Sequence, residues 1–243
     1  MFQSFFPVIL WYAYRRTEEC DVCYILPNMG KKCCTRQNMI YYILPNVVFF
    51  LYLRQNIRIM STIIGRRNEV EELEKLYHSE RPEFVAVYGR RRVGKTFLIK
   101  QALKGRITFQ HTGVSPVDQE GERNRMKTQL ESFYYSLLNH GLEGFKKPKS
   151  WMEAFFQLEQ LLIALDDGSR QVVFIDELPW MDTPRSGFLP AFESFWNGWC
   201  SGRDNLMLVV CGSATSWILG NLSRNRGGLY GRLTDEIKLS PFT

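Results

Sequence analysis

FVAVYGRRRVGKTFLIKQ, residues 84–101, is the most informative stretch of the chain. It opens with an apolar run, Phe84–Tyr88, of the β-branched and aromatic residues that are typical of a buried strand. Gly89–Thr96, GRRRVGKT, then matches the pattern G-x-x-x-x-G-K-[ST] at every fixed position, and apolar residues at helical spacing follow it. This order of strand, glycine-bounded loop and helix predicts a phosphate-binding loop. An ordinary strand–helix turn that happens to contain glycines is the alternative.

The predicted loop gathers several groups around a polyphosphate. Glycines let the backbone approach phosphate oxygens closely, and the start of the next helix adds N–H donors and a positive dipole end. Lys95 can reach the β- and γ-phosphate oxygens, and the Thr96 hydroxyl can bind Mg²⁺. The loop residues that we expect to contact nucleotide are Gly89, Arg90, Arg91, Arg92, Val93, Gly94, Lys95, Thr96 and Phe97. The sequence therefore predicts a nucleoside triphosphate site.

A second motif, QVVFIDELPW at residues 171–180, supplies carboxylates. Val172–Ile175 is a continuous apolar run, as expected of a strand covered on both faces. It ends in Asp176 and Glu177, and carboxylates at the end of a buried strand are unfavourable without partners or a function. Downstream of a phosphate loop, we expect Asp176 to hold Mg²⁺ and Glu177 to orient and deprotonate the attacking water. The alternative is an acidic strand end that caps the following turn.

A further apolar run, Leu206–Cys211, precedes a polar segment that includes Ser213 and Thr215. In one large division of phosphate-loop ATPases, an extra strand lies between the loop strand and the aspartate-bearing strand and ends in a residue that senses the γ-phosphate. Ser213 is the predicted sensor and Thr215 the second choice. An N-cap for a helix over Trp217–Leu222 is an equally good interpretation and does not exclude the first.

The rest of the region after residue 60 alternates between expected helices and strands. Further on, Arg232 is the candidate for a charge-stabilising arginine that acts on its own site or on a neighbour's, with a surface arginine as the alternative. In the helix expected over 151–165, Phe155, Leu158, Leu162 and Leu165 should face the core. Other helices are expected over 70–78, 118–140 and 188–199, and other strands over 62–64, 106–110 and 236–239.

Composition leaves the partner open. The chain has 243 residues, a net charge of +6 and six cysteines. A mildly basic protein fits this charge better than a dedicated nucleic-acid binder, because part of the excess belongs to the phosphate loop. Cys200 and Cys211 should be buried apolar residues. Four more cysteines (Cys20, Cys23, Cys33 and Cys34) indicate free thiols in a reducing cytoplasm, with a zinc site as the minority alternative.

Residues 1–59 differ from the remainder and are interpreted as an N-terminal extension, with the ATPase core at 60–243. The extension holds two apolar stretches, 5–14 and 39–53, and an exact repeat of YILPN at 24–28 and 42–46. The second stretch is short for a bilayer crossing, which needs about 20 residues. We expect sequence that precedes a natural start at Met60 rather than a functional domain; a membrane-associating hairpin is the rival interpretation.

Five motifs in order carry a family resemblance: GRRNE at 65–69, GRRRVGKT at 89–96, FIDELPW at 174–180, CGSATSW at 211–217 and LYGRLT at 229–234. Together they resemble the archaeal-type ATPases, an AAA+-like and STAND-related branch of the phosphate-loop proteins. The resemblance implies a three-layer α/β/α fold with a parallel sheet of order 5-1-4-3-2, and ATP and Mg²⁺ at the carboxyl ends of the strands. It also implies that Ile64, Gly65 and Arg66 line the adenine and ribose side. Relatives of this kind usually continue into a helical lid, and we expect residues 60–243 to form the core without that lid.

Three functions are compatible with these motifs. The first is a cytoplasmic, Mg²⁺-dependent ATPase, and the second is a nucleotide-gated interaction module with little turnover. The third is a small-molecule kinase, but no phosphoacceptor pocket or short arginine-rich lid supports it. A homo-oligomer or a protein partner is compatible with the first two, whereas no expected helix presents a convincing basic face for nucleic acid. Membrane contact is expected only if residues 1–59 form an anchor.

Overall fold

The computed structural model describes residues 24–26, 29–32, 65–115, 122–223 and 227–241. The chain divides into two compact units, residues 1–58 and 59–243. In the first unit, β1 (Tyr24–Leu26) pairs antiparallel with β2 (Met29–Lys32), Leu26 lying opposite Met29. The two apolar stretches, the four N-terminal cysteines, the second copy of the repeat and the strand expected at 62–64 lie outside the described residues.

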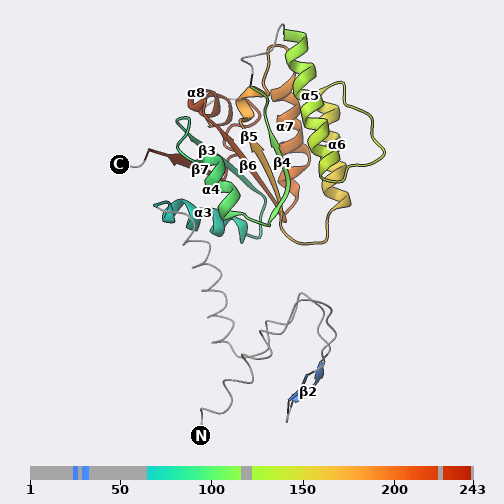
Figure 1. The fold of residues 1–243 in the computed structure, drawn as a ribbon, viewed down its shortest axis with the longest axis vertical. Helices are drawn as coiled ribbons and strands as arrows, with labels where there is room; N and C mark the ends of the chain where they lie inside the picture. The colour runs from blue at the N-terminus through green and yellow to red at the C-terminus, as the bar shows by residue number, and fades with distance from the viewer. Residues whose placement is uncertain (1–23, 27–28, 33–64, 116–121, 224–226, 242–243) are drawn as a thin grey trace. The chain divides into compact units, whose positions relative to one another are not determined.

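The second unit is built on a five-stranded sheet in which every strand pair is parallel (Figure 1). Its order is β4-β5-β6-β3-β7. Numbered along the chain, these strands run 2-3-4-1-5, which is the expected order 5-1-4-3-2 seen from the other edge. The expected extra strand, β6, lies between β3 and β5. The strands are β3 (Glu83–Gly89), β4 (Ile107–Thr112), β5 (Gln171–Asp176), β6 (Leu206–Gly212) and β7 (Asp235–Leu239).

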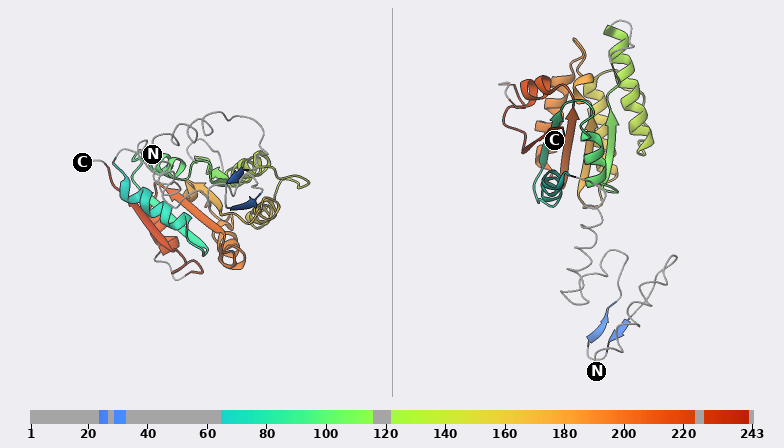
Figure 2. Two further views of the ribbon diagram at one scale, coloured as in Figure 1. Left: turned by 90° about the horizontal axis from the view of Figure 1, so that it is seen from below. Right: turned by 60° about the vertical axis from the view of Figure 1, so that its left-hand side comes forward.

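Helices cover both faces of this sheet, and Figure 2 shows the arrangement from two further directions. They are α3 (Arg67–Tyr77), α4 (Lys95–Ala102), α5 (Glu122–Asn139), α6 (Trp151–Ala164), α7 (Phe188–Gly198) and α8 (Thr215–Ile218), with short turns η2 (Leu178–Trp180), η3 (Cys200–Gly202) and η4 (Leu219–Ser223). Along β3, Phe84 and Ala86 pack into the core beneath α5, α6 and α7, whereas Val85 and Val87 pack beneath α3 and α4. The alternation of side chains along a strand thus produces three layers.

Two expectations about helix ends are wrong. Leu165 is 42% exposed, because α6 ends at Ala164 and Leu165 is only its C-cap residue. The N-cap of α8 is Ala214, which has no side chain able to accept a hydrogen bond from the helix. The capping interpretation of Ser213 and Thr215 is therefore not realised.

All strands point the same way, so their carboxyl ends meet at one edge of the sheet. Gly89 lies beside Leu239, Tyr88 beside Gly212, and Thr112 beside Asp176. The loops that follow β3, β4, β5 and β6 consequently lie together. This is the edge at which open α/β sheets bind their ligands.

Candidate functional site

The phosphate loop connects β3 to α4. Gly94, with φ 89°, is the N-cap of α4 and has no side chain, so it provides no side-chain acceptor for the first N–H groups of this helix, which lack an intrahelical partner in any α-helix. Arg92, with φ 65°, is also left-handed. Lys95 is only 6% exposed, and its Nζ donates to the carbonyls of Gly89 at 3.1 Å and Arg90 at 2.9 Å. The lysine thus lies folded back along the inside of the loop, with its ammonium group beside the backbone that would surround an anion.

Glycine is required at the start of this loop. Gly89 has φ 151°, and a Cβ there would lie 2.2 Å from the carbonyl oxygen of Leu239, a backbone atom that cannot move aside as a side chain could. The last residue of β7 therefore packs directly behind the loop, and the loop's first glycine is fixed by sterics as well as by the motif.

Thr96 and Asp176 meet across the sheet edge. The Thr96 hydroxyl donates to Asp176 Oδ2 at 2.8 Å. Asp176 Oδ1 accepts from the Cys211 thiol at 2.5 Å and from the backbone N–H of Glu177 at 3.0 Å. Burial and the Asp176 carboxylate raise the pKa of the Cys211 thiol well above its ordinary value, so this thiol remains a donor at neutral pH. A hydroxyl and a carboxylate are hard oxygen ligands that fit Mg²⁺, which binds few protein groups and keeps several waters.

Glu177 lies beside Ser213, at the end of the neighbouring strand. Its Oε2 accepts from the Ser213 backbone N–H at 3.1 Å and from the Ser213 hydroxyl at 3.2 Å. The same hydroxyl accepts from Arg91 Nε at 3.5 Å, and the Arg91 guanidinium lies 5.9 Å from the centre of the Trp180 ring. Glu177 Oε1 bonds no described residue in this arrangement. One oxygen of the glutamate is thus fixed and the other is available.

The backbone of Glu177 is left-handed, with φ 48° and ψ 45°. For a residue other than glycine this conformation costs on the order of 1–2 kcal/mol, so the surroundings must impose it. Pro179 packs against Gly212, where a Cβ would lie 2.7 Å from the proline ring. Gly113 packs against the turn from the other neighbouring strand, where a Cβ would lie 2.7 Å from the Glu177 carbonyl oxygen. Because neither glycine carries a Cβ, the turn can pack directly against the ends of β4 and β6.

Sequence reasoning missed the residues that support this turn and the predicted metal ligand Asp176: Cys211, Gly113, Pro179 and Gln129. Cys211 was expected to be buried, and it is, but its bond to Asp176 was not expected. Gln129 is fully buried on α5, within the apolar stripe of Met126, Leu130 and Phe133. A polar side chain on an apolar helix face is the signal that could have found it.

The remaining predicted nucleotide contacts are spread around the loop. Arg90, Arg91 and Arg92 are exposed, Phe97 is 53% exposed on α4, and Val93 is partly buried against the α3–α4 core.

Before α3, Gly65 is exposed with φ 74°, and Ile64 lies outside the described residues. Arg66 is 8% exposed and donates to Glu69 Oε1 at 3.1 Å and to the Ser240 carbonyl. Its guanidinium thus holds protein groups beside the end of β7.

Arg232 lies near the amino ends of the strands, whereas Lys95 and Asp176 lie at their carboxyl ends. It is exposed, and two residues later Thr234 bonds Phe84 near the amino end of β3, its N–H donating to the Phe84 carbonyl at 2.8 Å. Gly89 follows five residues further along β3, which at the rise of a strand is about 16 Å away. Arg232 therefore does not join the cluster around Lys95 within its own chain.

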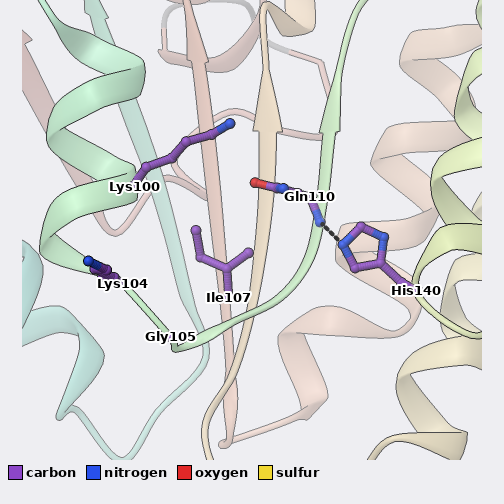
Figure 3. A pocket seen from close by; sticks show the side chains of 6 residues that line it. All are labelled: Lys100, Lys104, Gly105, Ile107, Gln110 and His140. Atoms are coloured by element: carbon purple, nitrogen blue, oxygen red, sulfur yellow. Dashed lines mark hydrogen bonds between the residues drawn. The ribbon is translucent and has the colours of Figure 1, made fainter.

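A separate pocket of about 280 Å³ lies beside the edge strand β4 and the end of α4 (Figure 3). It is lined by Lys100, Lys104, Gly105, Ile107, Gln110 and His140, and the Gln110 N–H donates to His140 Nε2 at 3.4 Å. None of the predicted site residues lines it.

Across the described parts of the chain, no three His, Cys, Asp or Glu side chains cluster in a way that would hold a metal ion. In those same parts, the helices are too short or too polar to cross a membrane.

The chain is similar in sequence to two proteins of Methanocaldococcus jannaschii. An uncharacterized protein of Methanocaldococcus jannaschii is 27% identical over 180 residues, which are 73% of this chain but only 36% of that protein. A second protein of the same organism, described as an uncharacterized ATP-binding protein, is 42% identical over 43 residues, which are 18% of this chain and 73% of that protein.

Among solved structures, the Walker-type ATPase PABY2304 of Pyrococcus abyssi matches with a TM-score of 0.50 and 21% identity, over 74% of this chain and 54% of that one. At this identity the likeness is one of fold. The model of a family described as an ATPase domain predominantly from Archaea matches residues 63–243, which include the whole parallel sheet and its phosphate loop. The chain therefore belongs to this family of archaeal ATPase domains.

Proposed function

We propose that residues 60–243 form an Mg²⁺-dependent ATPase domain of the AAA+ and STAND type that hydrolyses ATP at the carboxyl edge of its sheet. Lys95 and the loop backbone bind the β- and γ-phosphates, and Thr96 and Asp176 hold the metal. Glu177 orients the attacking water and accepts its proton, and Ser213 reports the γ-phosphate. The observation that carries the proposal is the Thr96–Asp176 hydrogen bond of 2.8 Å, because it joins the two predicted metal ligands from separate motifs.

When bound, Mg²⁺ would neutralise charge on the β- and γ-phosphates, held by the Thr96 hydroxyl and the Asp176 carboxylate. The chain's own residues supply the rest. Lys95 needs only to exchange its bonds to the Gly89 and Arg90 carbonyls for phosphate oxygens. Glu177 keeps Oε2 on Ser213 while Oε1 accepts a proton from water. A γ-phosphate that approaches Ser213 would compete for its hydroxyl, which couples nucleotide state to the position of Glu177.

The test is to compare binding and turnover in the purified full chain. Calorimetry should detect Mg·ATP, and phosphate release should accompany it. Lys95→Ala should abolish both, whereas Glu177→Gln should preserve affinity and reduce kcat by about 10²-fold or more. Lys104→Ala and Glu143→Gln, exposed residues outside the site, are the matched controls and should change neither. Full turnover by Glu177→Gln would refute its assignment, and absence of binding by the wild type would refute the site.

Arg232 belongs to this proposal only as a residue that acts on the site of a neighbouring copy, because its own site is at the other edge of the sheet. Turnover per chain should then rise with protein concentration, and Arg232→Ala should remove that rise. A rate that is independent of concentration in both proteins would leave Arg232 as a surface residue.

A nucleotide-gated module with little turnover is the second candidate. The contact that favours it is the double hydrogen bond that keeps Glu177 on Ser213. In that case the wild type would bind Mg·ATP without releasing phosphate, and bound ATP would change its affinity for a protein partner or for a second copy. The calorimetric and phosphate-release measurements separate the two candidates.

A further inference from the structure

One buried glutamine connects the loops on both sides of Glu177. Gln129 lies on α5, and its side chain is fully buried. Its Nε2 donates to the carbonyl of Val114 at 2.7 Å and to the carbonyl of Trp180 at 3.0 Å. Its Oε1 accepts from the Val114 N–H at 3.0 Å. Both hydrogens of the amide and its oxygen are therefore used, and the two loops that follow β4 and β5 are joined through one side chain.

The Trp180 end of this link belongs to the turn that carries Glu177. The Trp180 N–H donates to the Glu177 carbonyl at 2.9 Å and closes the turn. On the Val114 side, the N–H of Gly113 donates to the Asp176 carbonyl at 2.9 Å. Gln129 thus bonds Val114, which follows Gly113, and Trp180, whose N–H closes the turn. Glu177 itself lies between these contacts in the left-handed conformation that its surroundings must impose.

Only an amide can make this set of bonds. A glutamate of the same length would lose both donated hydrogen bonds when ionised and at least one of them when protonated, and leucine would lose all three bonds. The rest of the turn would still be packed, because Pro179 lies on Gly212 independently of α5. Loss of the amide should therefore loosen the turn without dismantling it.

We propose that Gln129 is a positioning residue for hydrolysis: it holds the η2 turn so that the Glu177 carboxylate lies beside Ser213 at the phosphate site. The inference rests on the proposed role of Glu177. Gln129 acts through backbone groups of Val114 and Trp180, which are not among the predicted nucleotide or metal contacts. It should accordingly affect the chemical step and leave nucleotide affinity to the phosphate loop.

The experiment measures kcat, KM, the Kd for Mg·ATP and Tm for Gln129→Leu and Gln129→Glu in the full chain. We expect kcat to fall at least tenfold in both, with KM and Kd within twofold of the wild type. Gln157→Leu is the matched control, because Gln157 is also a buried helical glutamine (5% exposed) whose Nε2 donates to a loop carbonyl, that of Lys146, at 2.8 Å, but on α6. It should lower Tm and leave kcat unchanged.

A double-mutant cycle with Glu177→Gln distinguishes positioning from general destabilisation. If Gln129 acts through Glu177, Gln129→Leu should have little further effect on the residual turnover of the Glu177→Gln protein. Additive losses, unchanged kcat in the single variants, or failure of both Gln129 variants to fold while Gln157→Leu folds would overturn the inference. A wild type without turnover would overturn this inference and the proposed hydrolysis together, whereas a normal wild type with active Gln129 variants would overturn only this one.

Discussion

Asp176 has its carboxylate satisfied from three directions before any metal binds. Thr96, Cys211 and the N–H of Glu177 each donate to it, and the residue is only 5% exposed. A buried carboxylate without donors is strongly unfavourable, so these bonds allow a charge at the end of a buried strand. They also aim Oδ2 at Thr96, the other predicted metal ligand. The cluster that should hold Mg²⁺ is thus pre-arranged by ordinary hydrogen bonds.

A different buried group makes stability depend on pH. His111, on β4, is 3% exposed, and burial lowers its pKa from 6.5 to about 4. Its Nδ1 lies 2.8 Å from the Ser136 hydroxyl, and its Nε2 has no partner among the described residues. Between pH 6.5 and 4 the unfolded chain therefore binds a proton at His111 that the folded chain excludes. The free energy of unfolding should fall by about 2 kcal/mol from this residue between pH 7 and pH 5.

Urea unfolding of the wild type and His111→Phe at pH 7, 6 and 5 measures this contribution. The variant should lose less stability than the wild type on acidification, because phenylalanine cannot take up a proton in the unfolded state. Carboxylates that titrate in this range affect both proteins equally. Parallel pH profiles would show that His111 is not the group responsible.

Sequence patterns anticipate the residues of the site better than the residues that support them. Lys95, Thr96 and Asp176 could be selected because their spacing follows from the phosphates and the metal they would serve. Gln129 and Gly113 could not, because their contacts join loops whose approach depends on how β4 and α5 pack. Arg232 was proposed as a charge-stabilising arginine for its own site or a neighbour's, and the register of β7, with Asp235 beside Val85, puts it at the other edge of the sheet. Spacing along the chain carries no information about that register.

At the scale of elements, α6 shows how one helix separates core from surface. Its start is set by Ser150, whose hydroxyl accepts from the Glu153 N–H at 3.2 Å, as in a helix cap. Along its length, Phe155 is 1% exposed and stacks on Phe195 with ring centres 5.0 Å apart. Its neighbour Phe156 is 51% exposed. Adjacent residues of one type therefore have opposite environments.

This pair gives a direct test of the layer arrangement. Phe155→Ala should lower the free energy of unfolding by about 3–5 kcal/mol, because it leaves a cavity among aromatic rings. Phe156→Ala should cost less than about 1 kcal/mol, as is usual for exposed positions. Chemical denaturation of both variants makes the measurement. Similar losses for the two would mean that α6 packs with a different face inward.

The ends of elements were less predictable than their existence. The helices over 151–164 and 188–198 and all five strands of the sheet lie close to the expected ranges. Apolar periodicity locates such segments, because burial requires it. The last turn of a helix depends instead on local hydrogen bonds, which the apolar pattern does not reveal. Leu165 was therefore expected to be buried, but it is exposed. The expected helix near residue 217 is shorter than predicted and continues as the wider turn η4.

At the scale of the whole molecule, the family resemblance predicted the strand order. Buried apolar residues form one cluster on each face of this sheet, so both faces are covered by helices. The described core residues run from Val70 to Leu239, all within the second unit. A chain shortened to residues 60–243 should therefore unfold in one cooperative transition with a Tm within about 3 °C of the full chain's, which corresponds to about 1 kcal/mol. It should also bind Mg·ATP with the same Kd.

Differential scanning calorimetry and titration of the two chains side by side provide the comparison. Loss of the cooperative transition, or of nucleotide binding, in the shorter chain would show that residues 1–59 contribute to the fold and are not merely an extension. Membrane fractionation of both chains separately tests the rival hairpin interpretation.

Arg66 has a consequence for how this domain comes apart. It stands directly before α3, the first helix that the structure describes in the second unit, and donates to the Ser240 carbonyl just beyond β7. β7 is an edge strand and is paired along one side only, with β3. Because Arg66 also holds the chain just beyond β7, separation of the carboxyl end of β7 from β3 would require loss of this bond to the residue that precedes α3.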